Sequence, residues 1–251
     1  PDGAQAYTIV ESAEAQQVNT RVELSRAEQL MRERIRRRLM LDGVTLVDPA
    51  TTYIDAGVTV AADTTLLPGV HILGESIIGG GCRIGPNAVL RDMRVGDRCE
   101  IGGSTLEESS IGDDVTVGPY SHVRPGSAIE ADVHLGNYAE VKASRIGART
   151  QIGHFSYIGD AEVGCDVNIG AGTITANYDG VDKHRTRIGD GAFIGSDSML
   201  IAPVEVGARA RTAAGSVVTH DVPEGTLVVG DRKSTRLNSS HVALSRMPSS
   251  A

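Results

Sequence analysis

Large aromatic side chains are nearly missing from this chain. Its 251 residues include no Trp, 2 Phe and 6 Tyr, while hydrophobic residues still make up 40% of the sequence. A core built from this sequence must therefore be aliphatic and narrow. The ample apolar content excludes a disordered composition, and collagen is excluded because Gly does not recur at every third position.

Other absences narrow the class of protein. The sequence has no run of about 18 apolar residues that could cross a membrane and no start typical of a signal peptide. Its first residue is Pro1 rather than Met, so we expect a fragment of a longer chain. Three cysteines, Cys82, Cys99 and Cys165, lack metal-ligand spacing and favour a reducing, cytoplasmic compartment. The net charge of −8 argues against nucleic-acid binding.

Glycine, by contrast, is abundant at 30 residues, and it recurs with a period of six. An aliphatic residue followed by Gly occurs from Leu73-Gly74 and Ile78-Gly79 through to Val206-Gly207. This period is the signature of a hexapeptide-repeat solenoid. Three sides of six residues give about 18 residues per coil, with one inward aliphatic residue per side and a Gly that permits the corner conformation.

We therefore predict an all-β solenoid over residues 45–230. The repeat resembles the left-handed parallel β-helix of hexapeptide-repeat acyltransferases, and left-handedness comes from that resemblance alone. A β-helix without an active site, such as an ice-binding or scaffold solenoid, is the alternative.

One α-helix is predicted before the solenoid, at about 26–41 within a linker at 23–44. Ser25 and Glu28 fit a capping box, and Gly43 stands near the expected C-cap. Apolar residues follow at helical spacing: Leu30, Met31, Ile35 and Leu39. The other face carries five arginines, which fit either a solvated face or an anionic contact: Arg32, Arg34, Arg36, Arg37 and Arg38.

Two segments depart from the repeat. Asn177-Tyr178-Asp179-Gly180 has strong turn chemistry and is predicted to project from the solenoid as a loop. Residues 231–251 have neither hexads nor a helical pattern, and they resemble an in-frame translation of a sequencing-library adapter. We expect this tail to be non-native. Without it the chain carries 20 basic and 31 acidic residues, a net charge of −11.

Polar residues that interrupt the repeat mark a candidate site between His122 and Ser196. Arg124 and Lys142 are 18 residues apart, one coil by count, so their cations should stack on one edge and suit an anion such as phosphate. His154 can titrate near neutral pH and is the candidate general base. A metal site is a weaker alternative, because its ligands must converge. Its candidate ligands are His71, His122, His134 and His154.

Six stretches resemble one enzyme family, the bifunctional N-acetylglucosamine-1-phosphate uridyltransferase/glucosamine-1-phosphate acetyltransferases, over about residues 15–230. They are Val123-Arg124-Pro125-Gly126, Gly136-Asn137-Tyr138-Ala139-Glu140-Val141-Lys142, Gly153-His154-Phe155-Ser156-Tyr157-Ile158-Gly159-Asp160, Val167-Asn168-Ile169-Gly170-Ala171-Gly172-Thr173, Asn177-Tyr178-Asp179-Gly180 and Gly195-Ser196-Asp197. The resemblance implies acetyl transfer from acetyl-CoA to the amine of glucosamine 1-phosphate. It also implies a cytoplasmic homotrimer that supplies UDP-N-acetylglucosamine for bacterial peptidoglycan and lipopolysaccharide.

The resemblance also implies roles for individual residues. His154 matches the general base. The residues that match sugar-phosphate contacts are Arg124, Lys142, Tyr157 and Asn168. The residues that match acetyl-CoA contacts are Ala171, Asn177, Tyr178, Lys183, Ser196 and Ala214.

Two departures from the family limit what it implies. Residues 1–22 resemble only the end of the uridyltransferase domain, where Asn19 matches a contact to Mg and nucleotide sugar, so Asn19 should be idle and uridyltransferase activity absent. Arg232 is near a family coenzyme A contact but lies in the suspected non-native tail, so that role is not carried over. The alternatives are another hexapeptide-repeat acyltransferase with a different amine acceptor, and a non-catalytic β-helix fragment.

Overall fold

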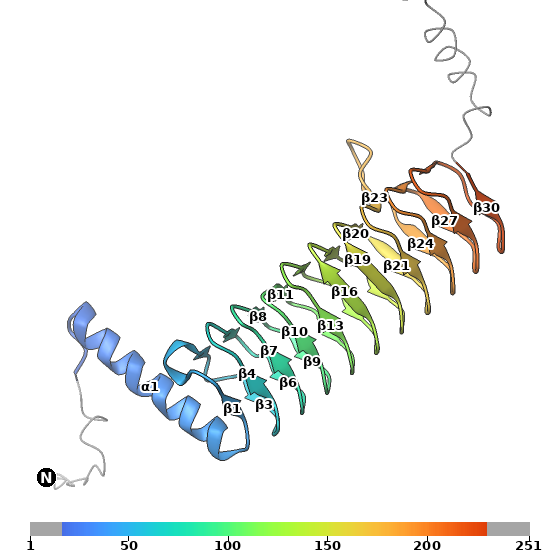
Figure 1. The fold of residues 1–251 in the computed structure, drawn as a ribbon. Coiled ribbons are helices and arrows are strands. Elements are labelled where there is room, and N and C mark those ends of the chain that lie inside the picture. Colours follow the sequence, from blue (N-terminus) through green and yellow to red (C-terminus); the bar gives the residue numbers. More distant parts are fainter. Residues whose placement is uncertain (1–16, 230–251) are drawn as a thin grey trace, which may run out of the picture.

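Three parallel β-sheets form the sides of a prism in the computed structural model, which describes residues 17–229 (Figure 1). Sheet A contains 11 strands: β1 (Thr45–Leu46), β4 (Thr65–Leu66), β7 (Arg83–Ile84), β10 (Glu100–Ile101), β13 (Thr116–Val117), β16 (His134–Asn137), β19 (Gln151–His154), β22 (Asn168–Ile169), β25 (Phe193–Ile194), β28 (Arg211–Thr212) and β30 (Leu227–Val228). Sheet B contains 10 strands: β2 (Tyr53–Ile54), β5 (His71–Leu73), β8 (Val89–Arg91), β11 (Thr105–Glu107), β14 (His122–Val123), β17 (Glu140–Lys142), β20 (Tyr157–Gly159), β23 (Ile174–Ala176), β26 (Met199–Ile201) and β29 (Val217–Val218). Sheet C contains 9 strands: β3 (Thr59–Val60), β6 (Ile77–Ile78), β9 (Arg94–Val95), β12 (Ser110–Ile111), β15 (Ala128–Ile129), β18 (Arg145–Ile146), β21 (Ala161–Val163), β24 (Thr186–Ile188) and β27 (Val204–Val206).

The chain visits the three sheets in turn, so every third strand pairs with its predecessor in the same sheet. Register partners lie about one coil apart in sequence: Val123 pairs with Val141 on sheet B, and Leu135 pairs with Ile152 on sheet A. This arrangement confirms the parallel solenoid that the period of six predicted. Side chains at the same point of successive coils therefore form straight columns along the prism.

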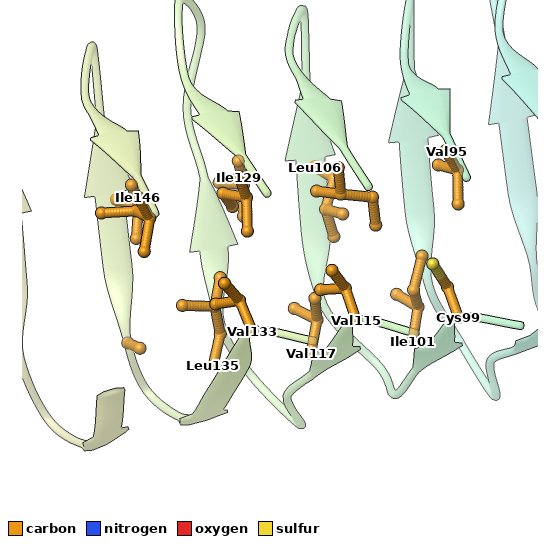
Figure 2. Packing of buried hydrophobic residues seen from close by; sticks show 14 of the residues in the cluster. Val95, Cys99, Ile101, Leu106, Val115, Val117, Ile129, Val133, Leu135 and Ile146 are labelled. Atoms are coloured by element: carbon orange, nitrogen blue, oxygen red, sulfur yellow. The ribbon is translucent and has the colours of Figure 1, made fainter. Parts of the chain in front are cut away.

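The core is aliphatic and small, as the composition predicted. The aliphatic residue before each repeat Gly points inward, and members of one column, such as Ile101, Val117 and Leu135, are almost completely buried (Figure 2). A smaller buried residue often lies two positions earlier, such as Cys99 before Ile101. Where that small residue is Ser or Thr, its hydroxyl bonds to backbone; the Thr150 hydroxyl, for example, donates to the Gly164 carbonyl at 2.8 Å. Polar atoms therefore enter the prism without being left unpaired.

The predicted reason for the repeat glycines is wrong at most corners. Of the aliphatic–Gly pairs, only those at Gly74, Gly85 and Gly118 have the Gly in the left-handed region. Most of the others are needed for space instead: a β-carbon on Gly136 would collide with the carbonyl oxygen of Gly153 on the next coil. Many left-handed positions are filled by residues other than Gly, often Asp, as at Asp166 with φ of 55°.

Helix α1 (Arg21–Leu41) lies beside the first coils of the solenoid and begins earlier than predicted (Figure 1). The capping box is formed by Thr20 and Glu23, not by Ser25 and Glu28. The predicted end is confirmed, because Gly43 adopts a φ of 93° directly after the C-cap. Only two residues of α1 are buried, Ile35 and Leu39.

The arginine face of α1 is partly committed to the solenoid. The Arg32 guanidinium lies 4.4 Å from the centroid of the Tyr53 ring, which itself stacks on His71 at 4.5 Å. Arg36 donates a hydrogen bond to the carbonyl of Pro49, in the short 3₁₀-helix η2 (Pro49–Thr51). These contacts favour a structural role for part of this face.

The predicted loop projects between β23 and β24 as a small hairpin (Figure 1). Tyr178 and Lys183 form an antiparallel bridge, and the Asp179 carboxylate accepts backbone hydrogen bonds from Val181 and Asp182, both at 2.8 Å. These bonds, with one from His184, lower the pKa of Asp179 strongly. The predicted non-native tail at 231–251 and the start of the predicted 1–22 remnant lie outside the described residues. Within residues 17–229, no helix is long and apolar enough to cross a membrane.

Candidate functional site

Four predicted site residues stand in one column at the corner between sheets A and B. From coil to coil they are His154, Ala171, Ser196 and Ala214. Backbone hydrogen bonds define the column: the residue after each corner donates to the corner residue one coil before. Gly172 donates to the carbonyl of His154 at 3.1 Å, Asp197 to that of Ala171 at 2.7 Å, and Gly215 to that of Ser196 at 2.7 Å. The candidate base and three candidate acetyl-CoA residues thus share one straight edge, which we call the A/B edge.

His154 is exposed at the end of β19, and one side-chain partner orients it. Its Nδ1 bonds to Oδ1 of Asn137, its register partner on β16. A carbonyl oxygen only accepts, so Nδ1 carries the proton and Nε2 keeps its lone pair. The geometry therefore presents the tautomer that a general base needs.

The predicted stacking of Arg124 and Lys142 is confirmed. Each follows a register partner, Val123 or Val141, and the two cations occupy the same position on successive coils of sheet B. Each also has a carboxylate partner that the sequence analysis did not single out. Arg124 pairs with Glu140 at 2.9 Å, and Lys142 pairs with Asp160 at 3.6 Å.

Asp160 connects this cation pair to the projecting hairpin. Its Oδ2 accepts a hydrogen bond from Nδ2 of Asn177, which is 8% exposed. The same amide nitrogen lies 3.5 Å from the hydroxyl of Tyr157, on the outer face of β20. The structure therefore brings Lys142, Tyr157 and Asn177 together around a residue that counting could have found, because Asp160 is 18 residues after Lys142.

Lys183 extends the cation cluster from the hairpin. Interaction with the Lys142 ammonium lowers the pKa of Lys183, since two adjacent ammonium groups repel. Tyr178, next to Asn177, is 60% exposed and donates from its hydroxyl to the carbonyl of Gly180 at 2.6 Å. The hairpin thus places one cation beside Lys142 and one open aromatic ring nearby in sequence.

Two predicted residues lie apart from this group. Asn168 is on sheet A, in register with Gln151 and Phe193, around the corner from Tyr157. Asn19 lies just before α1, at the other end of the molecule, where its backbone N–H donates to Glu23 at 2.8 Å.

The four histidines of the metal alternative do not converge. His71 stacks on Tyr53, His122 pairs with Glu107 at 3.1 Å, and the His134 ring lies 2.6 Å from the hydroxyl of Thr116 on sheet A. Across residues 17–229, no cluster of three or more His, Cys, Asp or Glu residues could hold a metal ion. The histidine hypothesis for a metal site is therefore wrong for this part of the chain.

A broad hollow lies on sheet C, away from all the predicted site residues. Its charges neutralise one another: Glu162, for example, pairs with both Arg185 and Arg187. The A/B edge and the outer face of sheet B, although less hollow, carry the clustered cations and the oriented imidazole. We therefore place the chemistry there.

The fold and the repeats define the class of protein. The family described as bacterial transferase hexapeptide (six repeats) matches residues 57–92, 108–143 and 185–220. The solved structure of an Arabidopsis UDP-N-acetylglucosamine acyltransferase shares the fold with a TM-score of 0.55, at 17% identity over 76% of this chain and 70% of that chain. The chain is thus a hexapeptide-repeat protein of the bacterial transferase type.

Sequence similarity gives the particular family. The bifunctional protein GlmU of Geobacillus sp. (strain WCH70) is 51% identical over 224 residues, which are 89% of this chain and 49% of that protein. GlmU of Pelobacter propionicus is 50% identical over 225 residues, again 89% and 49%. The chain is a homologue of the GlmU proteins and spans about half the length of these relatives.

Proposed function

We propose that this chain transfers the acetyl group of acetyl-CoA to the amine of glucosamine 1-phosphate, releasing CoA and N-acetylglucosamine 1-phosphate. The observation that carries the proposal is the A/B edge, where an oriented His154 heads a column of small residues beside a cluster of cations. Similarity to GlmU supports the same assignment. In this proposal the product feeds UDP-N-acetylglucosamine synthesis for the bacterial cell envelope.

His154 is proposed as the general base. The acceptor amine is mostly protonated at neutral pH, so a base must take up a proton before nitrogen can attack the thioester. Nε2 of His154 is free to do this, because Nδ1 holds the proton shared with Asn137. The exposed corner leaves the ring open to a substrate lying against sheet B.

The phosphate of the acceptor is proposed to lie at Arg124 and Lys142. Two carboxylates already balance these two cations, and Lys183 adds a third positive charge. The cluster of five groups therefore has an excess of one positive charge, which favours a bound anion. Tyr157, in register with Glu140, is proposed to contact the sugar phosphate as well, and Asn168 does so from around the corner.

Acetyl-CoA is proposed to lie along the A/B edge and beneath the hairpin. The small side chains of Ala171, Ser196 and Ala214 leave room for a long, thin ligand. A second column three residues farther along each coil, Ile174, Met199 and Val217, offers apolar contact. In the hairpin, Asn177, Tyr178 and Lys183 are proposed to complete the contact.

The remaining proposals concern organisation. We propose a homotrimer with sites between subunits, supported by the exposed position of His154 and by the resemblance of the sequence. Residues 1–22 are proposed as the end of a uridyltransferase domain, in which Asn19 would contact Mg only when that domain is intact. We also propose that 231–251 is a non-native tail.

A thiol-release assay tests the proposed function. CoA release from acetyl-CoA is measured with glucosamine 1-phosphate, glucosamine and unrelated amines as acceptors. Loss of the base in His154→Ala should lower the rate by about 100-fold or more, whereas His134→Ala, on sheet A and paired with Thr116, should retain it. A folded protein that releases CoA with no amine would support a non-catalytic solenoid instead. Preference for another amine would support a different acyltransferase.

A further inference from the structure

The partner of His154 is the feature that the proposed function leaves without a role. Asn137 lies at the end of β16, and its Cα is the register partner of the His154 Cα. The only side-chain hydrogen bond that the structure gives to His154, within residues 17–229, is the one to the Asn137 amide oxygen. Resting on the proposed function, we propose that Asn137 is a positioning residue that holds the catalytic histidine in its Nδ1–H tautomer.

The backbone fixes the two side chains next to each other. Asn137 and His154 are each followed by an aromatic residue in the left-handed region, Tyr138 with φ of 56° and Phe155 with φ of 49°. The Phe155 N–H donates to the Asn137 carbonyl at 3.2 Å. The two rings stack with centroids 5.1 Å apart and planes 6° from parallel. Matching conformations on adjacent coils therefore hold the amide and the imidazole in the same relative position.

The stack continues for one more coil, which strengthens this alignment. Tyr120 lies below Tyr138 with ring centroids 5.3 Å apart, and it also adopts a left-handed φ, of 61°. The three rings form an aromatic ladder beside the corner column. Because backbone and rings both repeat, neither Asn137 nor His154 can move along the edge without disturbing its neighbour.

An exposed histidine needs such a partner. Exposure alone does not select a tautomer, and water could accept from or donate to either ring nitrogen. An amide oxygen at Nδ1 selects the form whose Nε2 accepts a proton. A neutral amide does this without adding negative charge, unlike a carboxylate at the same place, so it leaves the basicity of the ring to its other surroundings.

Two variants separate this role from a general loss of structure. Asn137→Leu keeps the approximate size but removes the acceptor, whereas Asn137→Asp keeps an acceptor oxygen. Gln151→Leu is the matched control, because it removes an exposed amide from the same strand as His154. We expect Asn137→Leu to lower kcat by about 10- to 100-fold, the usual effect of removing an orienting partner from a functional histidine, with little change in KM. Asn137→Asp and Gln151→Leu should keep most of the activity.

The decisive readout is spectroscopic and does not depend on turnover. Long-range ¹H–¹⁵N spectra of the ¹⁵N-histidine-labelled full chain are recorded at about pH 8.5, well above the usual imidazole pKa of about 6.5. The His154 signal, assigned with His154→Ala, should show protonated Nδ1 in the native protein and in Asn137→Asp, but not in Asn137→Leu. Protonated Nε2 in the native protein, or an unchanged tautomer in Asn137→Leu, would overturn the inference. If the tautomers behave as expected but no amine is acetylated, the proposed function fails while the positioning contact stands.

Discussion

Replacing Gly136 by Ala is expected to destabilise the solenoid, whereas the same change at Gly153, one coil later, should be tolerated. A β-carbon on Gly136 would lie far inside the 3.0 Å limit that real β-carbons respect, and the atom it meets is the backbone carbonyl oxygen of Gly153. A β-carbon on Gly153 would have no heavy atom within 4 Å. Neither glycine has a left-handed φ, so backbone strain does not distinguish them.

The magnitude follows from what must move. A flexible side chain could rotate away, but here the obstacle is backbone, and the coils on either side are joined by the parallel pairing of β16 with β19. The coils must separate or twist locally, which typically costs about 1–3 kcal/mol. For a domain of this size each kcal/mol lowers Tm by about 2–4 °C, so we expect Gly136→Ala to melt about 2–12 °C lower. Gly153→Ala should be neutral or stabilising by up to about 1 kcal/mol, because Ala restricts the unfolded chain.

Thermal unfolding followed by circular dichroism measures both variants against the parent protein. The comparison is internal, since the two glycines occupy the same column on adjacent coils. Equal Tm values for Gly136→Ala and Gly153→Ala would refute the steric explanation of the repeat glycines. A lower Tm for Gly153→Ala alone would reverse it.

Two further predictions concern the cation cluster. Lys142→Met should raise KM for glucosamine 1-phosphate by about 10-fold or more, since charge-assisted hydrogen bonds contribute about 1.5–3 kcal/mol, but it should hardly affect transfer to unphosphorylated glucosamine; Arg91→Met, a cation of the same sheet beside Glu107, is the control, and an equal effect on both acceptors would contradict phosphate binding. Lys183 has a lowered pKa, so at a given pH more of it is neutral and it should react with an N-hydroxysuccinimide ester faster than Lys142; Lys142→Met should raise that pKa and slow the labelling of Lys183, measured by peptide mass spectrometry, and an unchanged rate would contradict the proposed repulsion.

The fold could be predicted because one local pattern repeats many times. Each aliphatic–Gly pair is weak alone, but the period of six determines the sides, the coil and the columns together. The reason for the glycines could not be predicted in the same way. Close approach between Gly136 and Gly153 depends on the distance between coils, whereas sequence patterns report on conformation within one coil.

The helix start shows a different limit. The sequence contains two overlapping capping boxes, one at Thr20 and Glu23 and one at Ser25 and Glu28. Both satisfy the local rule, and the earlier one is used because it adds a further turn of backbone hydrogen bonds to α1. Ser25 is exposed within the helix, where its polar side chain is tolerated.

The candidate site was predictable as far as residue counting reaches. Arg124 and Lys142 stack as expected because no insertion separates them. Counting did not identify Asp160 or Asn137 as partners, since the coil length varies between 17 and 18 residues along sheets A and B. A shift of one residue along the chain moves a side chain to the opposite face of a strand, so contacts of this kind need the register itself.

The columns also make the solenoid a ruler. Neighbouring parallel strands are about 4.8 Å apart, so positions along the A/B edge are available only in whole steps of that length. His154 and Ala214 are three steps apart along the edge, a separation of about 14 Å. Adding or removing one coil between them would change the reach of a bound ligand by one step while every strand kept its local geometry. Enzymes built in this way can adjust to longer or shorter ligands by changing their number of coils.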